Sequence, residues 1–130
     1  IEEGIYVPLH TALADLLLTN LVSNAIRHNI PHGTIRVKLS KAGLVISNTG
    51  KPPEVPTGEL FERFKKGNPG SDSIGIGLAI VRQICDIMNF DIVYEYISGR
   101  HILAISFLSS HPASKLLQNL EVTLSSTLQP

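Results

Sequence analysis

The chain has 130 residues, a length typical of one domain, and 43% of them are hydrophobic while 17% are charged. This apolar share is sufficient for an aliphatic core and excludes a disordered chain. The 11 basic and 11 acidic residues cancel, which disfavours a general binder of nucleic acid or membrane surfaces. The single cysteine, Cys85, excludes an internal disulfide and is typical of a reducing compartment. No apolar run has the length of a membrane span, and the abrupt start at Ile1 suggests a fragment of a longer protein.

The first half of the chain predicts a helix followed by a β-hairpin. Residues 11–29 form the strongest helical pattern, because apolar side chains recur there at helical spacing. These side chains are Leu17, Leu18, Leu21, Val22 and Ala25. Residues 34–40 and 44–48 are two short β-rich runs, and the intervening KAG predicts a tight connection between them.

The second half predicts a lid, a helix, a second hairpin and a tail. Residues 51–73 are rich in proline, glycine and charge, and so long a segment without regular pattern is typical of a functional loop. Residues 76–89 predict a helix, while residues 91–96 and 101–108 predict two strands joined by a turn at SGR. Residues 111–130 are expected to form a tail that holds at most one short helix.

The order of elements is strand, helix, hairpin, lid, helix, hairpin, with the first strand expected before residue 11. This order predicts an α/β (α+β) fold, a two-layer α/β sandwich with a mixed β-sheet and helices packed on one face. A doubly wound parallel sheet is disfavoured because the strands come mostly in adjacent pairs. We expect one domain at residues 1–110, with a lid at about 51–73, and a C-terminal tail at 111–130.

Asn20, Asn24 and Arg27 lie at helical spacing within the first predicted helix. At about 100° per residue, their side chains fall within an arc of about 60° beside the apolar stripe. A carboxamide oxygen is a suitable ligand for Mg²⁺, and a guanidinium suits phosphate. A solvated helix face explains the same residues about equally well, although two asparagines inside a helix are unfavourable by propensity and favour a functional role.

The sequence VISNTG places Asn48 at the end of an apolar strand, with Gly50 two residues later. Asparagine and glycine are common turn residues, so a strand-ending turn is the simpler interpretation. The functional alternative is an asparagine that projects into a pocket and bonds the edge of a base.

The sequence SIGIGLAI places Gly75 and Gly77 where a polar loop meets the second predicted helix. Backbone N–H groups of a glycine-rich loop at a helix N-terminus can bind an anion, and both glycines permit positive φ and a close approach. The segment lacks the preceding strand and third glycine of a dinucleotide fingerprint, and the Walker lysine is also absent. A phosphate that binds here would therefore be held differently from one in a dinucleotide fingerprint or a Walker motif.

In this order, four segments resemble the motifs of the ATP-binding catalytic domain of sensor histidine kinases, a domain whose superfamily includes gyrase, the heat-shock ATPase chaperones and the MutL mismatch-repair proteins. NLVSNAIRH is similar to the asparagine box, VISNTG to the first glycine box, LFERFKKG to the phenylalanine box and SIGIGLAIV to the second glycine box. The match runs from about Leu13 to Phe107. It implies a Bergerat-type fold with an ATP lid between the two glycine boxes.

The resemblance implies ATP and Mg²⁺ as the bound cofactors and assigns catalytic roles on the first helix. Asn24 matches the metal ligand, and Asn20 matches the companion that supports the phosphates and the metal. Arg27 and His28 match the residues that line the phosphates and the nucleotide.

The resemblance also assigns residues to the adenine site, the lid and the phosphate loop. Asn48 matches the residue that accepts a hydrogen bond from the adenine amino group, and Gly50 lets the backbone approach the base. Phe61 and Phe64 anchor the lid, and Phe64 is expected to contact the nucleotide. The second glycine box, which wraps the phosphates, supplies Ser73, Ile74, Gly75, Ile76, Gly77 and Leu78.

The chain departs from the family pattern at three places. Asn48 stands where the family usually has Asp, KPP stands where it often has a second Gly, and Ser73 opens the second glycine box in place of Gly. The Oδ1 atom of an asparagine still accepts a hydrogen bond, and a neighbour such as Ser47 or Thr49 is expected to fix the orientation of the amide.

One position favours a kinase over an ATPase. The ATPase branch carries a Glu four residues before the metal-binding asparagine, where this chain has Asn20, and a carboxamide accepts no proton at neutral pH. The expected reaction is therefore transfer of the γ-phosphoryl group to a histidine. None of the five histidines of this chain has the sequence context of an acceptor, so the acceptor is expected on a separate domain that is absent here.

The resemblance thus implies a two-component sensor histidine kinase involved in signal transduction. Its expected partners are the dimerisation and histidine phosphoacceptor domain of the same protein and a downstream response regulator, and no nucleic acid. The full-length protein is expected to be a membrane-anchored homodimer with this domain in the cytoplasm. The alternative is a pseudokinase module that binds nucleotide and regulates a partner without phosphotransfer.

Overall fold

The computed structural model describes residues 11–53 and 73–118, with side chains of the second range described from residue 77 onward. The described elements are α1 (Thr11–His28), β1 (Ile35–Leu39), β2 (Gly43–Thr49), α3 (Ser73–Met88), β3 (Asp91–Ile97) and β4 (Arg100–Ser106). Residues 113–118 add a short helical segment after β4. None of the helices described is both long and apolar enough to span a membrane.

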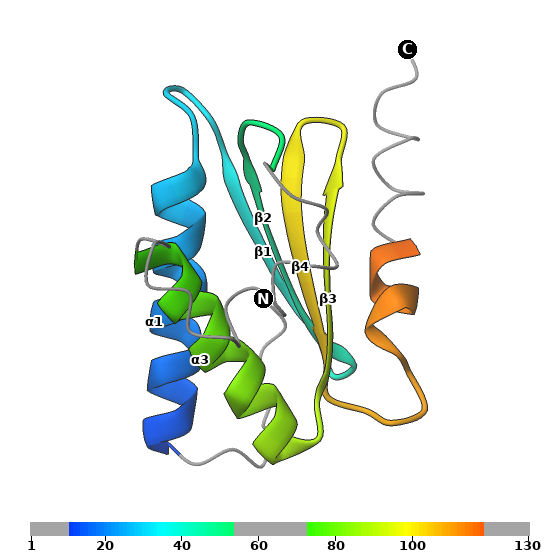
Figure 1. The fold of residues 1–130 in the computed structure, drawn as a ribbon. Coiled ribbons are helices and arrows are strands. Elements are labelled where there is room, and N and C mark those ends of the chain that lie inside the picture. The colour runs from blue at the N-terminus through cyan, green and yellow to red at the C-terminus, as the bar shows by residue number, and fades with distance from the viewer. Residues whose placement is uncertain (1–10, 54–72, 119–130) are drawn as a thin grey trace.

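The four described strands form one sheet in the order β1-β2-β4-β3, and every neighbouring pair is antiparallel (Figure 1). The two predicted hairpins are confirmed, and their second strands, β2 and β4, join them at the centre of the sheet. A mixed sheet was expected, but no described pair is parallel, because both short connections make hairpins and the central pair also runs antiparallel. The strand expected before residue 11 lies outside the described residues.

The turn between β3 and β4 has a specific backbone geometry. Ser98 and Gly99 have φ angles of 52° and 79°. Positive φ at both central residues is typical of a type I′ turn, whose twist matches that of the flanking strands. The turn therefore fixes the register in which Tyr96 lies opposite His101.

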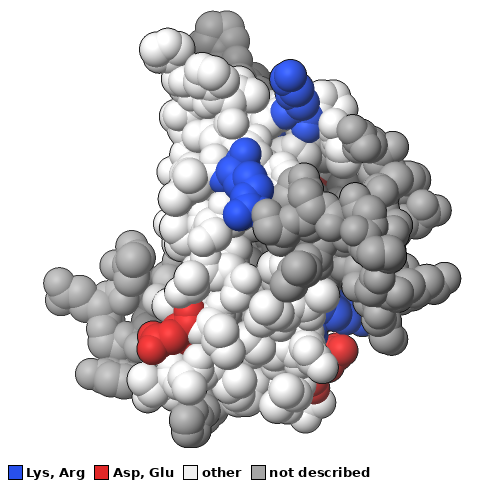
Figure 2. Space-filling view, turned by 60° about the vertical axis from the view of Figure 1, so that its left-hand side comes forward, with Lys and Arg blue, Asp and Glu red and all other residues white. Residues whose placement is uncertain are grey.

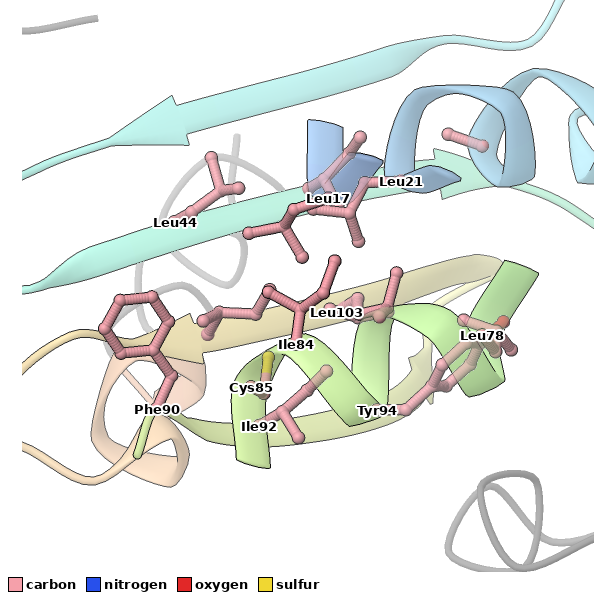
Figure 3. Close-up of a cluster of buried hydrophobic side chains, with 14 residues drawn as sticks. Leu17, Leu21, Leu44, Leu78, Ile84, Cys85, Phe90, Ile92, Tyr94 and Leu103 are labelled. Carbon is pink, nitrogen blue, oxygen red and sulfur yellow. The ribbon is translucent and has the colours of Figure 1, made fainter. Parts of the chain in front are cut away.

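Helices α1 and α3 pack side by side on one face of the sheet and enclose the main core (Figure 3). Leu17 and Leu21 of α1 meet side chains from α3 and the sheet there. The stripe predicted on α1 is only partly buried, because Leu18 and Val22 are 49% and 43% exposed. Cys85 is fully buried in this core, and the burial raises the pKa of its thiol to about 12, so it is a packing residue.

The second face of the sheet is also covered. Residues 113–118 lie against it, on the opposite side from α1 and α3 (Figure 1). Ala113 and Leu117 pack there on Val45 and Ile102, and the Ala113 N–H donates to Asp91 Oδ2 over 2.8 Å. The two long helices thus lie together on one face, as expected, and the short helical segment at residues 113–118 adds cover on the other. The physical reason is that β2 and β4 are buried on both faces and so need cover on both.

Helix α3 begins at Ser73, three residues before the predicted start. Gly75 and Gly77 thus belong to its first turns, and Gly99 is the one glycine with positive φ among the described residues. The helical repeat of apolar residues extends back to Ile74, and a glycine in a helix costs only about 1 kcal/mol. The glycine loop expected before the helix is therefore helical from Ser73 onward.

Candidate functional site

A small cavity lies between α1 and the sheet, at the carboxyl end of β2. Its polar lining comes from three elements that are distant in sequence: Asn24 of α1, Asn48 of β2, and Tyr94 and His101 of the second hairpin. The remaining lining side chains are aliphatic. The structure therefore brings the first two motifs of the sequence together and adds two aromatic residues to them.

Asn24 presents an unsatisfied oxygen at this cavity. Its Oδ1 is buried and has no hydrogen-bond partner among the described residues. A buried acceptor without a donor costs about 1–3 kcal/mol. A donor or a cation that binds this oxygen would remove that cost. A neutral hard oxygen in this position fits Mg²⁺, which needs few protein ligands when phosphates supply others. Among the described residues, no cluster of three or more His, Cys, Asp or Glu offers an alternative metal site.

Asn20 lies one turn earlier on α1 and meets the second glycine box. Its Nδ2 donates to the carbonyl of Leu16 over 2.7 Å. A Cβ atom placed on Gly77 would stand 3.3 Å from its Oδ1, so the two residues are in contact range although they lie far apart in the sequence. Asn20 of α1 and Gly77 near the start of α3 therefore lie side by side in the structure.

The remaining predicted residues of α1 lie at its last turn. Arg27 is exposed, whereas His28 is half-buried with its ring centroid 6.1 Å from that of His101. Of the second glycine box, Leu78 is 2% exposed, and its side chain belongs to the main core. Phe61 and Phe64 lie outside the described residues, and of residues 73–76 only the helical backbone is described.

Asn48 is 4% exposed, and its amide has a fixed orientation. Its Nδ2 donates to the main-chain carbonyl of Thr49 over 2.9 Å, which leaves Oδ1 to accept from a ligand. The neighbouring hydroxyls do not perform this task. That of Ser47 accepts from Arg100 over 3.1 Å, and that of Thr49 bonds Asn29 and the Thr34 N–H.

Tyr94 and His101 form a hydrogen-bonded chain beside Asn48. The Nε2 atom of His101 lies 2.7 Å from the carbonyl oxygen of Lys51, which can only accept, so Nε2 carries the proton. Nδ1 then accepts from the hydroxyl of Tyr94 over 2.8 Å. Burial lowers the pKa of His101 and raises the pKa of Tyr94 to about 12, so both groups are neutral at pH 7.

Gly50 is required here by close packing. A Cβ atom would stand 2.6 Å from the His101 ring and 2.8 Å from the carbonyl oxygen of His28. The Gly50 N–H donates to the Gly99 carbonyl over 3.1 Å, and its own carbonyl accepts from the Tyr96 hydroxyl over 2.9 Å. Because Gly50 has no side chain, the end of α1, the end of β2 and the second hairpin can pack closely at this point.

Sequence reasoning missed Tyr94, Tyr96 and His101 as residues of the site. The two-residue turn does place Tyr96 opposite His101, so half of the cluster could have been found from the hairpin alone. The pairing of His101 with Asn48 depends on the register between β2 and β4, which no local pattern encodes.

The surface above α1 carries little charge. Figure 2, with this side turned forward, shows isolated basic and acidic side chains and no continuous patch of either sign among the described residues. Leu18, Val22 and Ile26 are exposed along this helix, the last to 62%.

The chain matches the family model of the histidine kinase-, DNA gyrase B-, and HSP90-like ATPases over residues 11–124. It therefore belongs to this family of ATP-binding domains. The relatives it matches place it in the sensor histidine kinase branch.

Two such relatives show the extent of the similarity. The chain is 37% identical over 78 residues to the sensor protein IrlS of Burkholderia pseudomallei, covering 53% of this chain and 17% of that protein. It is 30% identical over 102 residues to the signal transduction histidine-protein kinase AfsQ2 of Streptomyces coelicolor, covering 72% of this chain and 19% of the relative. The chain thus spans about a fifth of these relatives.

Solved structures share the fold. The catalytic domain of histidine kinase ThkA matches with a TM-score of 0.62 and 26% identity, over 81% of this chain and 73% of that one. The cytoplasmic segment of histidine kinase QseC matches with a TM-score of 0.60 over 83% of this chain and 54% of that one, and at 18% identity it supports the fold alone.

Proposed function

We propose that this domain binds Mg·ATP and transfers the γ-phosphoryl group to a histidine on a separate dimerisation domain of the same protein. The observation that carries the proposal is the buried Oδ1 of Asn24, which lacks a partner at the cavity between α1 and the sheet. A bound metal ion would relieve this unmet demand and would neutralise developing charge on the phosphates. Asn24 is the residue of the chain that would hold it.

The two ends of the site have separate tasks in this proposal. Asn48 accepts a hydrogen bond from the adenine amino group through Oδ1, since Nδ2 is already engaged. Asn20, Arg27 and the backbone of the first turns of α3 contact the phosphates, because N–H groups at a helix N-terminus favour an anion.

Kinase chemistry is favoured because Asn20 offers no base for water. It lies one turn before Asn24 on α1, and a carboxamide accepts no proton. In this proposal ATP is therefore not hydrolysed at the phosphate end, and the γ-phosphoryl group remains for a protein acceptor.

The rest of the proposed protein follows from the branch to which its relatives belong. We infer a homodimeric, membrane-anchored sensor with this domain in the cytoplasm. Its phosphoacceptor histidine lies on the dimerisation domain, and a response regulator receives the phosphoryl group. The small share of each relative that the chain spans is consistent with such a modular protein.

Calorimetry with Mg·ATP tests nucleotide binding. Asn24→Ala is expected to weaken binding by about 1–3 kcal/mol, because a charge-assisted partner is lost. The same substitution removes an unsatisfied buried oxygen, so the free energy of unfolding without nucleotide should not fall. Thr19→Ala, on the exposed side of the same helix, is the matched control. Affinity that is the same with and without Mg²⁺ would refute the metal role.

Phosphotransfer needs a second assay. Labelled ATP is incubated with this domain and a separate histidine phosphoacceptor domain. Acid-labile, base-stable label on the acceptor is expected, and none on this chain alone. Nucleotide binding without any transfer to several acceptor domains would instead support the regulatory pseudokinase.

A further inference from the structure

We infer that Tyr94, Tyr96 and His101 form a clamp that positions the backbone of Gly50 and Lys51, so that Asn48 presents its oxygen to the base. These three aromatic residues are positioning residues, and the inference rests on the proposed binding of ATP. They act through the chain that leaves β2, and none of them needs to touch the nucleotide.

The clamp holds two consecutive carbonyl groups. The Tyr96 hydroxyl donates to the Gly50 carbonyl over 2.9 Å, and His101 Nε2 donates to the Lys51 carbonyl over 2.7 Å. The Gly50 N–H donates in turn to the Gly99 carbonyl over 3.1 Å. Three hydrogen bonds therefore tie two residues of the exit from β2 to the second hairpin.

The rings support these bonds by packing. The ring of Tyr96 lies 4.8 Å from that of His101, and the ring of Tyr94 lies 5.8 Å away in an edge-on arrangement. The absent side chain of Gly50 makes room for His101, as the 2.6 Å approach of its ring to an added Cβ demonstrates. The clamp and the glycine are thus parts of one close-packed arrangement.

A single tautomer of His101 is compatible with this arrangement. The Lys51 carbonyl requires a proton on Nε2, and the Tyr94 hydroxyl, which donates to Nδ1, keeps that nitrogen free of one. Tyr94 therefore selects the form of His101 that holds the backbone.

Asn48 depends on the backbone that the clamp fixes. Its Nδ2 donates to the carbonyl of Thr49, the residue directly before Gly50. If the peptide that carries this carbonyl moves, the amide can rotate and present its donor in place of its acceptor. Adenine offers an amino donor at the corresponding edge, whereas guanine offers a carbonyl, so this rotation decides between ATP and GTP.

The test is the ratio of Mg·ATP to Mg·GTP dissociation constants, measured by calorimetry for wild type and variants. His101→Phe keeps a ring but loses the bond to Lys51, and we expect about tenfold weaker ATP binding with GTP binding changed less than about twofold. His101→Gln, whose amide can donate where Nε2 does, is expected to restore most of the ATP preference. His111→Gln, an exposed histidine outside the cavity lining, is the matched control.

Two conservative variants keep the inference testable if His101→Phe does not fold. Tyr96→Phe removes the bond to Gly50, and Tyr94→Phe removes the donor to His101 Nδ1. Each is expected to lower the ATP preference by about threefold. Nitrogen chemical shifts of the His101 ring should report a proton on Nε2 in wild type and a smaller excess of this tautomer in Tyr94→Phe, where the Lys51 carbonyl alone favours it.

An unchanged ATP-to-GTP ratio in these variants, or equal losses for both nucleotides, would overturn the clamp while leaving the proposed function intact. A wild-type protein that binds neither nucleotide would refute the proposed function itself. A proton on Nδ1 of His101 in wild type would also overturn the clamp.

Discussion

The proposed base end, around Asn48 and His101, and the proposed phosphate end, around Asn20 and Asn24, are built differently. At the base end, Asn48 and His101 are 4% and 7% exposed, and Asn48 Nδ2 and both ring nitrogens of His101 have partners within the domain. At the phosphate end, Asn20 and Asn24 are half-buried, and the Oδ1 of Asn24 has no partner among the described residues. Both ends lie within one layer between α1 and the sheet.

The difference indicates how binding energy is used. A base end whose hydrogen bonds are already made needs little reorganisation when adenine arrives, so it supplies selectivity. At the phosphate end, the Oδ1 of Asn24 gains a partner only when phosphate and metal are bound. The contribution of this end to the binding free energy therefore depends on both. Substitutions at the base end should therefore destabilise the free protein, whereas those at the phosphate end should act on binding.

Paired glycine substitutions give the largest expected contrast. Gly50→Ala places a Cβ atom 2.6 Å from the His101 ring and 2.8 Å from a backbone oxygen, so the free energy of unfolding should fall by about 3 kcal/mol. Gly77→Ala meets only the end of the Asn20 side chain at 3.3 Å, within a helix, so stability should rise by up to about 1 kcal/mol. Urea denaturation measures both.

Mg·ATP binding completes this comparison. Gly77→Ala should weaken it despite the added stability, because Asn20 must move from its place beside α3. A Gly77 variant that is more stable and binds as well as wild type would remove this glycine from the phosphate end. A Gly50 variant as stable as wild type would mean that His101 and the end of α1 can separate at no cost.

At high pH, the base end should lose stability through ionisation of Tyr94, whereas the asparagines of the phosphate end should not contribute to this loss. Burial raises the pKa of Tyr94 from 10.0 to about 12, so its neutral form is favoured by folding. The stability from this group is fully present below pH 10 and is lost as the pH rises towards 12, by about 1.4 kcal/mol per pH unit. Asn20 and Asn24 do not titrate in this range.

Cys85 provides the control for this titration. Its pKa is raised from 9.0 to about 12, so the core should begin to lose stability from pH 9 upward. Urea midpoints from pH 8 to 11 are compared for wild type, Cys85→Ala and Tyr94→Phe. Cys85→Ala should leave the loss above pH 10 that belongs to Tyr94, and Tyr94→Phe should leave the earlier loss. Identical pH profiles in all three proteins would contradict both assignments.

Much of this contrast was predictable where the pattern is local. Both hairpins and the two helices follow from periodicity and turn residues, and these elements are confirmed. Asn20 and Asn24 could be singled out together because asparagine is unfavourable inside a helix by propensity. The start of α3 was misplaced because two glycines suggested a loop, although the apolar repeat continues through them.

The parts that sequence could not supply depend on long-range register. The cover over the second face of the sheet uses residues 113–118, whose apolar positions are too few to distinguish a packed helix from a tail. The clamp depends on β4 lying beside β2 with His101 opposite Asn48, a pairing across more than 50 residues. Side-chain alternation constrains such a register only once the neighbouring strand is known.

The smallest expected effect is that of Asn48→Asp on base selectivity. A carboxylate accepts more strongly from the adenine amino group, and this would favour ATP by about 1–2 kcal/mol. In this structure, however, Asn48 Nδ2 donates to the Thr49 carbonyl over 2.9 Å, and an aspartate would place a second acceptor there. Repulsion between these two oxygens should cancel most of the gain, so the ATP-to-GTP preference should rise by no more than about threefold. Stability should fall by about 1 kcal/mol because the bond to Thr49 is lost. Calorimetry with both nucleotides and urea denaturation check the two outcomes. A preference that rises tenfold without loss of stability would mean that the Thr49 carbonyl does not orient this side chain.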